Sequence, residues 1–167
     1  MRFYPAALAL SLLVGVTASM GSAKSADPLD PRAEALLKAG RDYLAQGRVA
    51  DATDQFEAAL TIDPAYVGSY LALADAARRD GLQGKALHYY RVALNRDPNN
   101  LAAISGEGGA LLEKGAVEKA RRNLARLEGL CGRRCPETQQ LSAAISAGPQ
   151  PKVQSAEATL PEPVETP

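Results

Sequence analysis

The chain has 167 residues and carries 19 basic (Lys and Arg) and 19 acidic (Asp and Glu) side chains, so its formal net charge is zero. This balance argues against a dedicated nucleic-acid-binding protein, and the length suits one small domain. The charge is unevenly distributed. Residues 27–63 hold eight acidic and four basic residues, a net of −4, and residues 114–134 hold seven basic and two acidic residues, a net of +5. We therefore expect an acidic first end and a basic last end.

Residues 1–23 have the features of a secretory signal peptide. Arg2 gives a cationic start, residues 5–18 are mainly apolar, and small residues precede a polar stretch. The apolar run is too short to span a bilayer comfortably. We predict cleavage after Ala23, with Ala18 as the alternative site and an uncleaved anchor as the alternative interpretation. The mature chain is then expected to be exported, to a bacterial periplasm, without stable membrane insertion.

A polar lead-in, residues 24–32, precedes the first helical pattern. From residue 33 onward apolar residues recur at helical spacing. A glycine at position 47 interrupts the pattern, because glycine readily adopts the left-handed conformation that ends a helix. A second helical stretch stops at Asp63-Pro64, since the residue before proline disfavours helix. Two helices joined by a tight turn form a helical hairpin.

This hairpin pattern recurs every 34 residues. The repeated positions are the glycines Gly47, Gly81 and Gly115, the alanines Ala52, Ala86 and Ala120, and the larger residues Phe56, Tyr90 and Leu124. We predict three hairpins, in residues 33–66, 67–100 and 101–134. Small residues at Gly40, Ala74 and Gly108 are expected where paired helices approach closely. A period near 34 with helical spacing inside each unit predicts an α-solenoid.

The end of the array differs from the repeats. Residues 135–147 predict a short capping helix, which a solenoid needs because its open end exposes an apolar face. Residues 148–167 are rich in proline and poor in large apolar residues, so we predict disorder. Cys131 and Cys135 are the two cysteines of the chain. We predict a disulfide that fastens the cap; a redox-active pair and a metal site are the alternatives.

The three units resemble the tetratricopeptide repeat family, whose pattern is W-x2-L-G-x2-Y, then A-x3-F, then P. The matching residues are Leu36, Ala39, Gly40, Tyr43, Ala52, Phe56 and Pro64 in the first unit, Tyr70, Leu73, Ala74, Ala77, Ala86, Tyr90 and Pro98 in the second, and Ile104, Gly108, Leu111, Ala120 and Leu124 in the third. The third unit departs at Glu107, where an apolar residue is expected, and lacks the final proline. The resemblance covers about residues 33–134 and implies an all-α solenoid of three helix-turn-helix repeats plus a C-terminal capping helix.

The resemblance also implies a concave groove that holds an extended or helical peptide. The residues expected to project there are Leu37, Arg41, Leu44, Leu71, Asp75, Arg78, Ser105 and Leu112, with Tyr66 at the border. A simply solvated face is the alternative. The lysine and asparagine clamp that some members use for a terminal carboxylate is absent, because Leu37 and Arg41 occupy the matching positions.

We therefore expect a non-enzymatic periplasmic adaptor or assembly factor with a protein or peptide partner and no cofactor or metal. The alternatives are a self-associating envelope protein, with its acidic end stacked on its basic end, and a thiol-disulfide redox protein. His88 is expected on an outer face, and the glycine-rich residues 106–109 lack the strand that a phosphate loop follows. The basic cluster around Arg121, Arg122 and Arg126 is either a solvated face or a surface for an acidic partner, a membrane or the tail.

Overall fold

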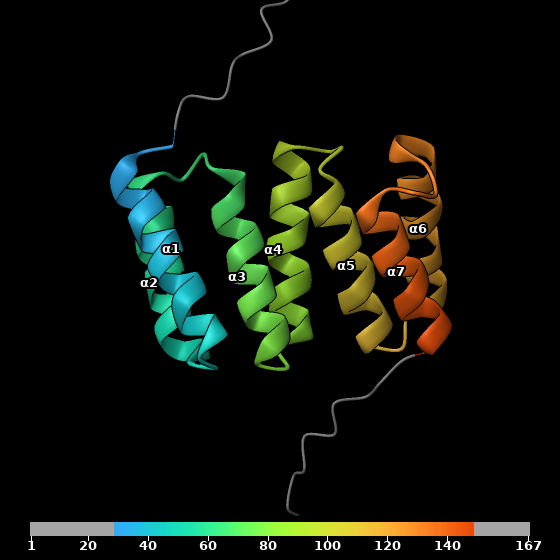
Figure 1. Ribbon diagram of the computed structural model, residues 1–167, viewed down its shortest axis with the longest axis horizontal. Helices are drawn as coiled ribbons and strands as arrows, with labels where there is room; N and C mark the ends of the chain where they lie inside the picture. The colour runs from blue at the N-terminus through green and yellow to red at the C-terminus, as the bar shows by residue number, and fades with distance from the viewer. Residues whose placement is uncertain (1–28, 149–167) are drawn as a thin grey trace, which may run out of the picture.

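The computed structural model describes residues 29–148, which form seven α-helices and no β-strand. The helices are α1 (Pro31–Ala45), α2 (Val49–Ile62), α3 (Val67–Arg79), α4 (Gln83–Arg96), α5 (Leu101–Glu113), α6 (Val117–Cys131) and α7 (Pro136–Ala147). Consecutive helices pair as three hairpins, and α7 packs on α5 and α6 (Figure 1). The predicted all-α solenoid with a capping helix is confirmed. The predicted signal peptide and the tail from residue 149 onward lie outside the described residues.

The same turn closes each hairpin. Gly47, Gly81 and Gly115 have φ angles of 76°, 75° and 77°, in the left-handed region that glycine adopts without strain. In the first hairpin the N–H of Arg48 donates to the carbonyl of Tyr43, and the N–H of Gly47 donates to the carbonyl of Leu44. These two bonds satisfy carbonyls that the helix end leaves unpaired. The sequence period thus reflects a backbone requirement at the turn.

Helix α1 begins at Pro31, two residues before the predicted start, so the predicted lead-in was too long. The side chain of Asp30 accepts a hydrogen bond from the N–H of Arg32 at 2.8 Å, and proline occupies the first turn. Both features stabilise a helix N-terminus. The predicted stop before Asp63-Pro64 is correct, because α2 ends at Ile62.

Small residues set the spacing of helices inside the stack. A Cβ atom at Gly40 would lie 2.3 Å from the ring of Phe56, which is fully buried. A Cβ atom at Gly108 would lie 2.6 Å from Leu141 of α7. Gly40 therefore lets α2 pack closely in the first hairpin, and Gly108 lets the capping helix pack closely on the third. Leu141 itself is 2 % exposed and packs with Ile104 and Leu127.

The third repeat keeps its shape despite Glu107. The Glu107 side chain is 14 % exposed. It accepts hydrogen bonds from Arg91 of α4 at 3.2 Å and from Asn123 of α6 at 3.0 Å. A partly buried carboxylate is tolerated when it is paired in this way. Polar contacts between α4, α5 and α6 thus replace the apolar contact that the repeat pattern predicts.

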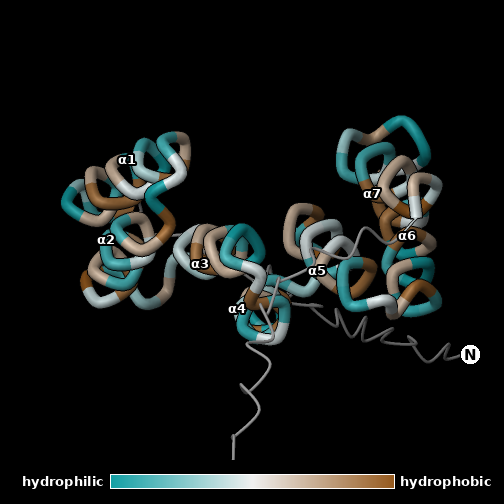
Figure 2. Tube along the Cα trace, turned by 90° about the horizontal axis from the view of Figure 1, so that it is seen from below, coloured by the Kyte–Doolittle hydropathy of each residue, from teal (hydrophilic) through white to brown (hydrophobic). Residues whose placement is uncertain are grey.

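The helices form an arc. Figure 2 shows α1, α3, α5 and α7 on its inner side and α2, α4 and α6 on its outer side. Among the described residues, no helix is both long and apolar enough to cross a membrane.

Candidate functional site

The inner side of the arc carries a series of adjoining hollows, which we call the concave groove. The first hollow, of about 420 Å³, lies between α1 and α3. Leu44, Tyr66 and Leu71 are among its apolar lining residues, and Arg41 and Asp75 bring charges to it. Tyr66 caps the N-terminus of α3. A Cβ atom at Gly68 would lie 2.2 Å from the Tyr66 ring, so glycine leaves room for that ring in the groove.

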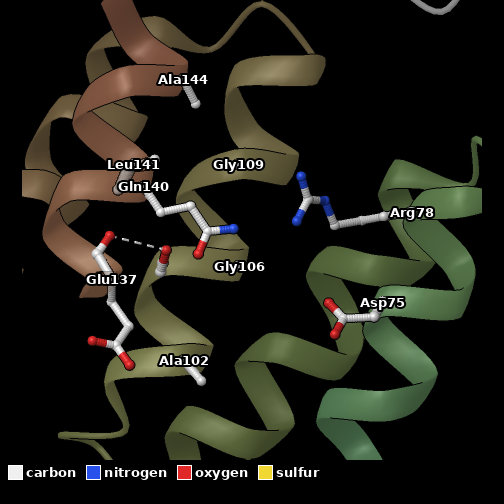
Figure 3. A pocket seen from close by; sticks show the side chains of 10 residues that line it. Asp75, Arg78, Ala102, Gly106, Gly109, Glu137, Gln140, Leu141 and Ala144 are labelled. Atoms are coloured by element: carbon white, nitrogen blue, oxygen red, sulfur yellow. Dashed lines mark hydrogen bonds between the residues drawn. The ribbon is translucent and has the colours of Figure 1, made fainter. Parts of the chain in front are cut away.

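The second hollow, of about 230 Å³, lies between α3, α5 and α7. Figure 3 shows Asp75 and Arg78 on its α3 side, and Gln140 extending from α7 toward Arg78. Two further hollows, of about 320 and 250 Å³, also include Arg78 in their walls. Because Asp75 lines three of these hollows and Arg78 lines three, the hollows form one continuous surface.

A polar network occupies the centre of the groove. The hydroxyl of Tyr90 donates to Asp75 Oδ1 at 2.5 Å. Arg78 donates to both oxygens of Glu113, at 2.5 Å from Nη2 and 3.3 Å from Nε. The network connects α3, α4 and α5, and the paired guanidinium and carboxylate form a charge-assisted contact. It therefore fixes the second hairpin against the third.

Both donors of this network have shifted pKa values. Burial, followed by the nearby Asp75 carboxylate, raises the pKa of the Tyr90 hydroxyl above its ordinary range. Burial lowers the pKa of Arg78, but the hydrogen bond to Glu113 and the neighbouring Tyr90 outweigh it and raise that pKa. Tyr90 is therefore neutral and Arg78 charged at physiological pH. The network holds α3, α4 and α5 together and presents charge to the groove.

Two glycines of α5 bring this network together. A Cβ atom at Gly106 would lie 2.3 Å from the ring of Tyr90, and one at Gly109 would lie 2.8 Å from Nη2 of Arg78. The two glycines weaken the helix, but they allow side chains of α3 and α4 to approach its backbone. Tyr90 and Arg78 pack directly on the backbone of α5.

The structure brings most of the predicted groove residues together. Arg41, Leu44, Tyr66, Leu71, Asp75 and Arg78 line the concave groove, as does Leu112 at its far end. Their role in partner binding stays a prediction. Ser105 also lines the second hollow, although it is only 7 % exposed, and its hydroxyl donates to the carbonyl of Glu137 at 3.3 Å, which attaches the cap.

The placement of Leu37 in the groove is wrong. Leu37 is 1 % exposed and belongs to the core cluster that includes Phe56 and Leu73. Its equivalent in the second repeat, Leu71, is partly exposed in the first hollow. The same repeat position is therefore covered in the first hairpin and partly open in the second. Burial of an aliphatic side chain is favourable, and at Leu37 the residues of the core cluster provide that burial.

Sequence reasoning missed three groove residues: Tyr90, Glu113 and Gln140. The sequence indicates Tyr90 only as a repeated larger residue, whereas in the structure its hydroxyl reaches Asp75. Glu113 follows Arg78 by 35 residues, one repeat and one position, which is a spacing that could have indicated an ion pair between neighbouring first helices. Gln140 belongs to the non-repeated cap, for which the period predicts nothing.

The two cysteines lie between α6 and α7, away from the network. Their sulfur atoms are placed as a bonded pair, with Cα atoms 5.7 Å apart. Formation of this disulfide in solution stays a prediction. Cys131, Cys135 and Glu137 are the sole group of three close potential metal ligands in residues 29–148. A disulfide removes both thiolates that metal binding requires. His88 is exposed on α4 and stacks beside Tyr89.

No protein-family model matches the sequence, and no curated protein matches it either. Many solved structures share its fold. The first tetratricopeptide domain of Spaghetti (RPAP3), bound to the HSP90 peptide SRMEEVD, has a TM-score of 0.62 and 22 % sequence identity, over 70 % of this chain and 92 % of that one. The Yersinia enterocolitica type III secretion chaperone SycD, in complex with a peptide of the translocator YopD, has a TM-score of 0.60 and 24 % identity, over 68 % and 86 %.

The Sgt2 tetratricopeptide domain from Aspergillus fumigatus is similar to the same extent. Its TM-score is 0.63 at 23 % identity, over 71 % of this chain and 80 % of that one. Identities this low establish architecture alone. Residues 29–148 therefore have the fold of a tetratricopeptide repeat domain.

Proposed function

We propose that this chain is a non-enzymatic protein-interaction module that holds a segment of a partner protein in the concave groove. The observation that carries the proposal is the continuity of the groove along the inner helices, from Arg41 on α1 to Ala144 on α7. Two of the similar solved structures, those of RPAP3 and SycD, contain bound peptides. A recognition groove of this kind takes a peptide by apolar anchors and a few charges.

The lining defines the chemistry of the partner segment. The first hollow offers Leu44, Tyr66 and Leu71 to an apolar anchor, and the exposed Arg41 beside it favours an acidic neighbour. The centre presents Asp75 together with the Arg78–Glu113 pair, which suits hydrogen-bonding groups of an extended backbone. The partner segment we propose is short and carries one large apolar residue next to an acidic one.

We also propose that the module works in the bacterial periplasm, as an adaptor or assembly factor for another envelope protein. The support is the cationic and apolar character of residues 1–23 and the even pair of cysteines after them. Fractionation of host cells and N-terminal sequencing of the recovered protein test this. A mature chain that starts at Lys24 is expected, and a cytoplasmic chain with an intact Met1 would contradict it.

Site-specific crosslinking tests the groove directly. A photo-crosslinking amino acid in place of Arg41 should capture a partner in the host, whereas the same amino acid in place of His88, on an outer helix, should not. Equal capture from both positions would contradict groove binding.

The captured partner then allows a quantitative prediction. Arg41→Glu together with Leu71→Gln should raise the dissociation constant at least ~10-fold, because it removes an apolar contact and reverses a charge. The matched control is Lys119→Glu, which makes the same charge reversal on exposed α6. Isothermal titration with the purified partner segment measures both. An unchanged affinity in the groove variant would refute the proposal.

A further inference from the structure

The outer side of the arc carries two surfaces of opposite charge. The first is an acidic hollow of about 270 Å³, which is lined by residues of α2, α3 and α4. Asp54, Glu57 and Asp80 line it with a single cation, Lys85. Lys85 lies 3.9 Å from Glu57, a loose pair, and Asp54 and Asp80 form no ion pair within residues 29–148. The remaining lining is mostly apolar, with the exposed Leu82 at the rim.

The second surface is a basic ridge along α6. Arg122, Arg126 and Leu130 follow one another at a spacing of four residues, so they lie on one helix face. Arg133 and Arg134 come directly after the helix and extend the ridge. Arg126 donates to the carbonyl of Pro98, and Arg133 lies 3.5 Å from Glu128. The ridge thus presents one exposed leucine, with arginines before it and after it in the chain.

The two surfaces match in apolar character as well as in charge. Leu82, 44 % exposed, and Leu130, 42 % exposed, are the two large hydrophobic residues that residues 29–148 leave exposed. One borders the acidic hollow and the other lies in the basic ridge. An apolar cavity of ~150 Å³ already holds a benzene-sized group, so the hollow has room for a leucine side chain.

We propose that the basic ridge of one copy docks into the acidic hollow of a second copy, with Leu130 placed against Leu82 and the arginines opposite Asp54, Glu57 and Asp80. Because the two surfaces differ, the contact is heterologous, and each bound copy leaves one hollow and one ridge open. The contact uses the outer side of the arc and leaves the concave groove free, so it adds to the proposed function and does not depend on it.

The contact is small, so we expect a dissociation constant on the order of 0.1–1 mM. Sedimentation velocity of the mature chain should show an average mass that rises with protein concentration. The average mass should decrease when the salt concentration is raised from about 50 mM to about 500 mM, because screening weakens contacts between exposed charges. A chain that stays monomeric over the whole range would overturn the proposal.

Paired charge reversals identify the surfaces. Leu130→Glu with Arg134→Glu reverses the ridge, and Asp54→Lys with Glu57→Lys reverses the hollow. Each variant alone should associate at least ~10-fold more weakly, because like charges then face each other. An equimolar mixture of the two should associate again, because the ridge variant keeps an intact acidic hollow and the hollow variant keeps an intact basic ridge.

Matched controls carry the same charge changes elsewhere. Glu34→Lys with Asp42→Lys changes α1, and Ala125→Glu with Lys114→Glu changes exposed positions outside the ridge. Both controls should associate like the wild type at the low salt concentration at which the wild type associates, because their charge changes lie outside the two docking surfaces. Association that survives both reversals, or a mixture that stays monomeric while each reversed variant keeps its thermal unfolding profile, would overturn the proposal.

Discussion

Single residues of α5 control how closely the second hairpin approaches the third. Gly106 lies under the ring of Tyr90, and Gly109 lies under the guanidinium of Arg78. A glycine inside a helix costs about 1 kcal/mol relative to alanine. The cost is local, and the gain is a contact between helices of different repeats. The two effects can be separated by substitution.

We predict that Gly106→Ala destabilises the protein by about 1–2 kcal/mol. The added methyl group would overlap the buried Tyr90 ring, and overpacking typically costs ~1–3 kcal/mol, partly offset by the better helix propensity of alanine. Gly129→Ala in α6 is the matched control, because a Cβ there meets nothing within 4 Å. It should stabilise by about 0.5–1 kcal/mol. Urea denaturation measures both, and a stabilising Gly106→Ala would show that Tyr90 moves freely.

Tyr90 also predicts a specific pH dependence. Its pKa is raised in the folded state, by burial first and by Asp75 second, above the ordinary value of 10.0. A raised pKa gives a stability contribution that is complete below pH 10 and is lost as the pH rises further, because the unfolded tyrosine ionises first. Tyr90→Phe should cost about 1–2 kcal/mol at neutral pH. It should also lose less stability than the wild type between pH 9 and pH 11 in urea titrations. If the wild type and Tyr90→Phe lose the same unfolding free energy over this pH range, the pKa of Tyr90 is not raised in the folded state.

Residue-level prediction from sequence succeeded where backbone geometry was decisive and failed where side-chain surroundings were. The turn glycine Gly47 was identified because few residues adopt positive φ without strain. Leu37 was misplaced, because its repeat position does not reveal whether neighbours cover it. The Tyr90 hydroxyl was missed, since an aromatic residue at a packing position gives no sign of where its polar end points.

Among the helices, the capping helix α7 is the one that has no counterpart in the 34-residue repeat. It buries Leu141 against α5 and α6, and Thr138 is 2 % exposed near Cys131. Its existence was predicted from the need to close the stack, and the structure shows that it begins at Pro136, a favourable first residue of a helix. The contribution of Gln140 to the groove was not predicted, because the position of this side chain depends on the angle at which α7 packs.

We predict that the two cysteines are disulfide-bonded and that the bond holds α7 on the stack. Cys131→Ser with Cys135→Ser should lower the free energy of unfolding by about 2 kcal/mol, the value for a loop this short. Amide exchange should rise mainly in α7. Thiol titration of the unfolded wild type should find no free thiol. Two titratable thiols, or a double variant as stable as the wild type, would contradict the prediction.

Leu141→Ala provides a comparison that keeps the cysteines. It should cost about 2–5 kcal/mol by leaving a cavity between α5, α6 and α7. If the cysteine variant and Leu141→Ala both increase exchange in α7 while α1 and α2 stay protected, the cap behaves as one element.

For the whole molecule, the stack predicts a gradient of protection. Each hairpin of a solenoid contacts only its neighbours, and the middle hairpin has a neighbour on both sides. In the described chain, α3 packs on α1 and α2 of the first hairpin and on α5 of the third, and α4 packs on α5 of the third, whereas α1 contacts only α2 and α3. Burial on two sides should slow local opening.

We therefore expect amide protons of α4 to exchange at least ~10-fold more slowly than those of α1, measured by hydrogen exchange and mass spectrometry. Phe56→Ala should increase exchange in α1 and α2 first, since the Phe56 ring packs on Gly40 within the first hairpin. Uniform exchange across all three hairpins would instead indicate a single cooperative unit.

The architecture was predictable at this scale and the groove only in outline. A 34-residue period determines that α1, α3 and α5 share the inner side, and eight of the nine predicted groove residues line it. The Arg78–Glu113 pair and the hollow beside α7 depend on how the repeats are rotated against each other, which side-chain volumes decide.

The position of α7 limits how this architecture can be extended. It packs against α5 and α6 on the inner side, where the first helix of a fourth hairpin would lie (Figure 2), and Gly108 receives its Leu141. Adding a repeat therefore means replacing α7, and the new first helix must bring its own aliphatic residue to Gly108. A repeat inserted after Ala147 would therefore form a separate domain joined by a linker. A repeat inserted between Gly132 and Cys135 would compete with α7 for the surface of α5 and α6 that α7 already covers.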